Sequence, residues 1–241
     1  MNTNRRTFVT GTVASLALIG SSKLLGVETV PPTAAPAKPV RPEPKRGPKQ
    51  DLEQVAAFVR AGHGNLKVVQ EMVERDPAFV FATWDWGAGD WETALGGASH
   101  VGSRECARFL LSKGARIDPF CAAMLGERAV IAALVEADPV VVTTKGPHGF
   151  TLLYHVAISG DTAMADLLQP HLSPQAKDYN QSLSAAVRDG HLAMTKWLFE
   201  HGQVNPNSRD GLGQTPLGVA RKKGFTEVAD ELVRHGAEVG E

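Results

Sequence analysis

Apolar residues recur along this chain in pairs of short segments separated by a glycine. The segment before each glycine is rich in small residues. The segment after it carries Leu, Val, Met or Phe at helical spacing, as at Val228, Leu232 and Val233. Each pair therefore predicts two antiparallel helices, because glycine permits the left-handed backbone needed between them. The six glycines are Gly64, Gly102, Gly126, Gly160, Gly190 and Gly224.

The spacing of these glycines indicates an internal repeat. Four of the five intervals lie between 30 and 38 residues, and the interval from Gly102 to Gly126 is 24. One such helix pair cannot bury its apolar face alone, whereas stacked pairs bury a continuous core. The sequence therefore predicts an all-α solenoid of about six helix-turn-helix units over residues 51–241.

A short motif recurs in front of the glycines. Residues 215–220 read T-P-L-G-V-A, and threonine takes the same place, nine residues before the glycine, at Thr93 and Thr151. Threonine there can cap the inner helix. The fifth unit keeps this frame without the threonine, and the first and third units are degenerate. Together these copies resemble the ankyrin-repeat family, and the resemblance implies β-turn fingers along one edge of the solenoid.

The resemblance also implies a binding function, because in this family the fingers and inner helices commonly hold a protein partner. The finger of the second unit is long and aromatic, with Trp84, Trp86 and Trp91 flanked by carboxylates such as Asp85. Exposed tryptophans suit an interface hot spot. The alternative is that they fold over the degenerate first unit and cap its core, and one tryptophan can serve each purpose.

The third unit has nearly lost its finger, which predicts a notch beside the aromatic finger. Beyond it, His148 lies at the tip of the next turn and Tyr154 at the start of the next inner helix. One hypothesis is a pocket shared by these two residues and the three tryptophans. The other is that His148 shapes its turn and Tyr154 hydrogen-bonds neighbouring fingers. The predicted partner-binding residues are Trp84, Asp85, Trp86, Trp91, His148 and Tyr154.

The amino terminus predicts export. Arg5-Arg6, with Phe8 two positions later and an uncharged stretch behind, resembles a bacterial twin-arginine signal. We assign residues 1–28 to this signal, residues 29–50 to a proline-rich basic linker and residues 51–241 to the repeat domain. The expected location is the periplasm or cell envelope, and a disordered basic tail is the alternative. Cleavage or retention of the signal as a membrane anchor stays open.

Nothing in the sequence has the spacing of a catalytic motif. Asp85, Asp90, Glu92, Ser99 and His100 are close in sequence, but no nucleophile elbow, metalloprotease or phosphate-loop pattern is present. His100 falls at an inner-helix position where a solvent-facing polar residue is normal. Carboxylates such as Asp90 and Glu92 are abundant on any surface. We therefore predict no enzymatic activity.

Composition excludes several other classes. The formal net charge of −1 gives no reason to expect nucleic-acid binding, because proteins that bind nucleic acid usually show a basic patch. Two cysteines and scattered histidines show no ligand-spaced cluster, so we expect no metal and no cofactor. Cys106 and Cys121 fall at small apolar positions and are expected to be buried thiols, with a bridge between them left open.

These observations predict a non-enzymatic protein–protein interaction module that binds an envelope partner on its finger and inner-helix face. One alternative is an accessory or chaperone-like protector of an envelope enzyme. Another is a binder of a small ligand, such as a glycan fragment, through the tryptophan-rich finger. The identity of the partner and the oligomeric state stay open.

Overall fold

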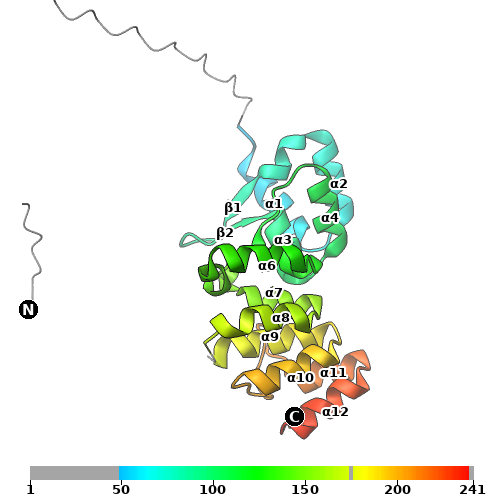
Figure 1. Ribbon diagram of the computed structural model, residues 1–241. Helices are drawn as coiled ribbons and strands as arrows, with labels where there is room; N and C mark the ends of the chain where they lie inside the picture. The colour runs from blue at the N-terminus through cyan, green and yellow to red at the C-terminus, as the bar shows by residue number, and fades with distance from the viewer. Residues whose placement is uncertain (1–48, 174–175, 239–241) are drawn as a thin grey trace, which may run out of the picture. The chain divides into compact units, whose positions relative to one another are not determined.

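The structure is a computed structural model that describes residues 49–173 and 176–238. The predicted signal and nearly all of the predicted linker lie outside these residues. The described part contains twelve α-helices that follow one another as six inner–outer pairs (Figure 1). The inner helices are α1 (Leu52–Gly62), α3 (Ala94–Val101), α5 (Pro119–Leu125), α7 (Leu152–Ser159), α9 (Ala176–Arg188) and α11 (Pro216–Lys223). The outer helices are α2 (Leu66–Arg75), α4 (Arg104–Ser112), α6 (Arg128–Ala137), α8 (Thr162–Leu168), α10 (Leu192–His201) and α12 (Thr226–Arg234).

Each inner helix packs on the next one along the chain. The series runs from α1 through α3, α5, α7 and α9 to α11, and α6, α8, α10 and α12 form a parallel series of outer helices. Apolar side chains from both layers form one continuous core, which includes Phe58, Leu153, Tyr179 and Met194. This arrangement is the predicted all-α, ankyrin-like solenoid.

Local signals in the sequence fix the ends of the helices. The hydroxyls of Thr93, Thr151 and Thr215 each accept a hydrogen bond from the backbone N–H three residues later, as predicted. The six repeat glycines all have positive φ, for example 79° at Gly102 and 75° at Gly224. A left-handed residue there lets the chain reverse into the outer helix.

The aromatic finger is a β-hairpin formed by β1 (Thr83–Asp85) and β2 (Trp91–Thr93), which pair antiparallel. The other short elements are the 3₁₀ turns η1 (Pro77–Phe81), η2 (Pro139–Thr143), η3 (Pro147–Gly149) and η4 (Gln169–His171). In the described residues, no helix has the length and apolarity that a membrane span requires.

The third unit lacks a finger, and the space beside it is filled by its neighbour. Turn η3 belongs to the fourth unit, yet it lies against α3 of the second unit, where the Pro147 ring lies close to Gly96. The backbone N–H of His148 donates to Asp90 Oδ1 at 2.8 Å, which joins this turn to the hairpin. The predicted notch is therefore occupied rather than open, because the fingerless unit lets the next turn reach past it.

Both cysteines are free thiols. Cys106 on α4 and Cys121 on α5 are completely buried, as the sequence predicts, and the open question of a bridge is resolved in favour of the thiols. Burial raises the pKa of Cys121 to about 12, so this sulfur stays protonated at neutral pH.

Candidate functional site

The hairpin register divides the tryptophans between two faces. Cross-strand partners share a face of an antiparallel pair. Trp84 is paired with Glu92, and Asp85 with Trp91, so these two pairs face opposite sides. Trp84 packs against the core, whereas 60% of the Trp91 surface is exposed. The expectation that different tryptophans serve as cap and as exposed surface agrees with this placement, and their role in partner binding stays a prediction.

Glu92 is a buried carboxylate. Only 1% of the residue is exposed. Its Oε2 accepts a hydrogen bond from Trp86 Nε1 at 2.7 Å, and His100 Nε2 lies 2.9 Å from its Oε1. Burial raises the pKa of Glu92, whereas the hydrogen bonds from His100 and Trp86 lower it. The lowering is the larger effect, so the net pKa is below the ordinary value. The sequence interpretation of Glu92 as a surface carboxylate is wrong.

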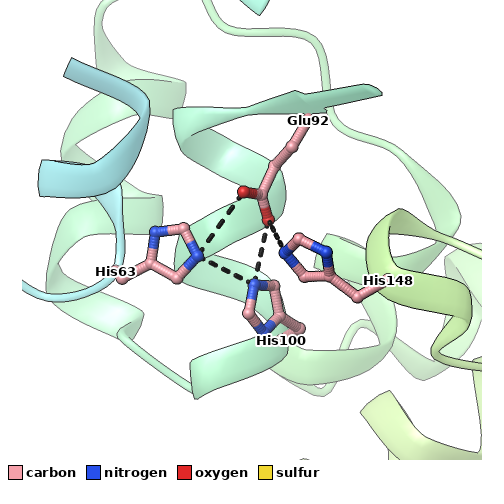
Figure 2. A group of neighbouring side chains, drawn as sticks. All are labelled: His63, Glu92, His100 and His148. Carbon is pink, nitrogen blue, oxygen red and sulfur yellow. Dashed lines mark hydrogen bonds and ion pairs between the residues drawn. The ribbon is translucent and has the colours of Figure 1, made fainter. Parts of the chain in front are cut away.

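Three histidines surround this carboxylate, each from a different element (Figure 2). His63 follows α1, His100 is in the last turn of α3, and His148 is in η3. The Nε2 atoms of His63 and His100 are 3.0 Å apart. Glu92 lies 3.5 Å from the Nε2 of His63, through Oε2, and 3.5 Å from that of His148, through Oε1. One ligand atom from each of the four residues lies within 4.8 Å of all the others.

The second ring nitrogens of two histidines are held by other groups. His63 Nδ1 lies 3.1 Å and 3.2 Å from the carbonyl oxygens of Val59 and Arg60, so it is the nitrogen that carries a proton. His148 Nδ1 lies 2.7 Å from Asp90 Oδ2. The φ of His148 is 59°, a left-handed value, and the two bonds to Asp90 hold it there. The prediction that His148 shapes its turn is confirmed.

His100 differs from its expected position. It is 7% exposed, not solvent-facing, because the hairpin and η3 cover the end of α3. Burial lowers the pKa of His100, and the adjacent Glu92 only partly offsets this effect. Spacing alone gave no sign of a cluster, since its members are far apart in the sequence and belong to the first, second and fourth units.

A small pocket opens above the histidines. It has a volume of about 270 Å³ and is lined by Arg60, His63, Trp86 and His148. Of the pocket predicted from three tryptophans, His148 and Tyr154, only Trp86 and His148 line this space. Glu92 and His100 are buried close beneath it.

A larger groove runs along the last three units. It has a volume of about 880 Å³. We call the surface formed by its lining residues the groove. These residues are Phe150, Tyr154, Lys177, Asn180, Gln181, Ser184, Ala185, Arg188, Ser208, Arg209, Asp210, Gly211, Leu212, Gln214, Pro216, Val219 and Lys223. They come from the turn before α7, from the inner helices α7, α9 and α11, and from the finger before α11. The groove therefore lies on the finger and inner-helix side of the stack.

Tyr154 belongs to this groove and not to the aromatic finger. Its ring stacks on Phe150 with centroids 4.2 Å apart. Its hydroxyl donates to the carbonyl oxygen of His100 at 3.0 Å and accepts from Arg188 at 3.4 Å. The prediction that Tyr154 hydrogen-bonds neighbouring fingers is wrong, because its partners His100 and Arg188 lie on the inner helices α3 and α9.

Cationic side chains outnumber carboxylates around the groove. Four lining residues are lysine or arginine, and one, Asp210, is acidic. Asp210 Oδ1 accepts the backbone N–H groups of Leu212 and Gln214, so this carboxylate shapes the finger. Arg188 forms a salt bridge of 3.1 Å with Asp189, which does not line the groove. The lining as a whole is suited to a ligand that carries negative charge.

Comparison with known proteins supports part of this description. The family model for ankyrin repeats (many copies) matches residues 183–233, which run from α9 into α12. No curated protein matches this chain. The matched stretch spans the fifth and sixth units, and its similarity to ankyrin repeats indicates a protein-interaction module.

Proposed function

We propose that this protein is a non-enzymatic interaction module and that the groove binds an acidic segment of its partner protein. The observation that carries the proposal is the position of the groove on the finger and inner-helix side of three successive units. In repeat proteins, such extended surfaces serve as binding sites. The ankyrin-repeat match covers two of the three units that form it.

The composition of the groove supports an acidic partner with apolar anchors. Phe150, Tyr154 and Val219 supply apolar surface, and Lys177 supplies an exposed cation in the first turn of α9. Leu212 is 81% exposed on the neighbouring finger, so an apolar partner residue can pack on it. Charge around such a site increases the association rate and favours partners of opposite sign.

A charge reversal in the groove tests this proposal. The full chain, Lys177→Glu and Lys196→Glu would be immobilised and exposed to a labelled poly-glutamate peptide at low and high ionic strength. Lys196 is the matched control because it is exposed on the outer helix α10 of the same unit. Weaker binding to Lys177→Glu alone, with a steep loss in salt, would support the groove as the site. Equal binding to all three proteins would refute it.

We further propose that the protein is exported to the bacterial envelope and meets its partner there. The twin arginines Arg5 and Arg6, followed by an uncharged stretch, support this location. The full chain would be expressed in a bacterium beside an Arg5→Lys, Arg6→Lys version, and cell fractions would be compared. Export lost in the double variant is the expected result. An unchanged distribution would contradict export by this route.

A further inference from the structure

The cluster of His63, Glu92, His100 and His148 shares no residue with the lining of the groove, although the Phe150 ring, which lines the groove, stacks on His100. Its side chains come from the first, second and fourth units, and their polar ends point toward one another (Figure 2). His148 joins the other three residues because the turn η3 reaches past the fingerless third unit. The cluster is therefore a feature of this chain and not of a generic repeat frame.

Three imidazoles and one carboxylate form a ligand set that suits a transition metal. Zn²⁺ binds His nitrogen and Asp or Glu oxygen, most often with four ligands in a tetrahedron. Ca²⁺ and Mg²⁺ prefer oxygen ligands, of which Glu92 is the single one in the cluster. The ionised Glu92 together with Asp90 behind His148 supplies two negative charges that balance a divalent ion.

The separations of the ligand atoms are close to those that such an ion needs. With metal–ligand bonds of about 2.0 Å, the ligands of a tetrahedral zinc site lie about 3.3 Å apart. Glu92 Oε1 lies 2.9 Å from His100 and 3.5 Å from His148, Glu92 Oε2 lies 3.5 Å from His63, and the Nε2 atoms of His63 and His100 are 3.0 Å apart. No pair is more than 4.8 Å apart. Closure around an ion therefore requires only small movements of these side chains.

The hydrogen bonds behind the histidines orient them as metal ligands. His63 donates from Nδ1 to backbone carbonyls, and His148 Nδ1 faces Asp90 Oδ2 at 2.7 Å. In metal sites the second ring nitrogen of a ligating histidine has this kind of partner, which fixes the ring and leaves the Nε2 lone pair for the metal. Two of the three imidazoles already have this arrangement.

Because of these hydrogen bonds, more lone pairs than N–H protons face the centre of the cluster. With Nδ1 protonated, His63 and His148 each present an Nε2 lone pair, and Glu92 presents oxygens toward the same point. A proton on His100 Nε2 can serve Glu92 and His63, but it leaves His148 Nε2 facing a carboxylate oxygen. A cation accepts all these electron pairs at once. The pocket of about 270 Å³ lined by Arg60, His63, Trp86 and His148 gives it a path from solvent.

We propose that His63, Glu92, His100 and His148 bind one divalent transition-metal ion, with Zn²⁺ as the best match. The bound ion joins the first, second and fourth units, so it stabilises the amino-terminal half of the repeat stack. Binding to the folded protein and not to the unfolded chain raises the melting temperature as the metal concentration rises.

Cobalt titration tests the proposal, because Co²⁺ occupies zinc sites and absorbs visible light strongly when four-coordinate. The full chain would be purified without an affinity tag, stripped with a chelator and titrated with Co²⁺. We expect one equivalent of Co²⁺ to give intense visible bands that an equivalent of Zn²⁺ removes and an equivalent of Ca²⁺ does not. Absence of the bands, or bands only at a large excess of metal, would overturn the proposal.

Variants locate the ion. Glu92→Gln keeps the size and the acceptor for Trp86 but removes the charge, and His148→Asn suits the left-handed backbone there. Both should lose the cobalt bands, whereas the control His171→Ala, at an exposed histidine of η4, should keep them. Identical bands in all three folded variants would refute the assignment, since the metal would then be bound elsewhere.

A milder change covers the case in which a ligand variant fails to fold. Asp90→Asn alters a half-exposed group behind His148 and should weaken metal affinity about 10–100-fold. Unchanged affinity in this variant would contradict the arrangement. The groove variant Lys177→Glu should bind the metal normally, so a failed metal test and a failed partner test are distinguishable.

Discussion

Acidification should destabilise this protein through His155. This residue lies on the inner helix α7, is completely buried, and its Nδ1 is 2.8 Å from the carbonyl oxygen of Thr151. Its Nε2 is buried without a hydrogen-bond partner among the described residues. Burial lowers the pKa of His155 to about 4 from an ordinary value of 6.5.

The sign and size of the effect follow from proton binding. Between these two pKa values the unfolded chain holds a proton on His155 and the folded protein does not, so the unfolding free energy decreases as the pH is lowered through this window. Because one pKa unit is worth about 1.4 kcal/mol, the loss is about 3 kcal/mol. The contribution is fully present above about pH 6.5, and no further loss from this residue occurs below about pH 4.

Denaturant unfolding at several pH values, with and without the histidine, isolates this contribution. His155→Asn keeps a donor for Thr151 and cannot titrate. We expect the unfolding free energy of the unaltered protein to fall by about 3 kcal/mol more across the window than that of the variant. The pKa of His100 is also lowered by burial, but the pH dependence that His100 contributes is the same in both proteins and cancels in the comparison. Equal pH dependence in the two proteins would refute the reasoning.

Two further experiments test the packing of the repeat stack. Cys121 should resist alkylation in the folded protein, because it is buried and its pKa is raised to about 12. After unfolding it should react at the rate of an ordinary thiol. Rapid labelling of Cys121 in the folded protein in a thiol assay would contradict this. Gly62→Ala should cost about 1–3 kcal/mol of unfolding free energy, because its new Cβ would collide with the backbone of α3. The control Gly211→Ala, where the space is open, should be nearly neutral in the same denaturation experiment, and equal losses would count against the packing described.

The repeat frame was predictable because its signals are local. Thr93 and Thr151 cap helices in the stretches where they occur, and Gly102 and Gly126 end the inner helices with positive φ. Each of these features depends on the chain within a few residues. The stacking order then follows, because each pair buries its apolar face on its neighbours.

The histidine cluster was not predictable from spacing, since it depends on how distant units meet. The fingerless third unit brings His148 to the hairpin, and the hairpin and η3 together bury His100. One local signal was available: once Trp84 faces the core, its cross-strand partner Glu92 has to face the same side. No position in the sequence marked His63 as a neighbour of this carboxylate.

The groove was predictable in its location but not in its residues. The ankyrin resemblance indicated the finger and inner-helix face, whereas the tryptophans drew attention to the second unit. Of the residues predicted to bind a partner, Tyr154 alone lines the groove. The cations of the groove come from three separate elements, and a charge on a surface helix is ordinary until its neighbours are known.

Hydrogen–deuterium exchange tests the central claim, partner binding in the groove, most directly. Exchange would be measured on the full chain alone and with the poly-glutamate peptide bound. The bound peptide should slow exchange in α9, in α11 and in residues 205–214, which form the groove, and leave α10 and α12 unchanged. Slower exchange confined to the outer helices, or no change in the groove, would contradict the account.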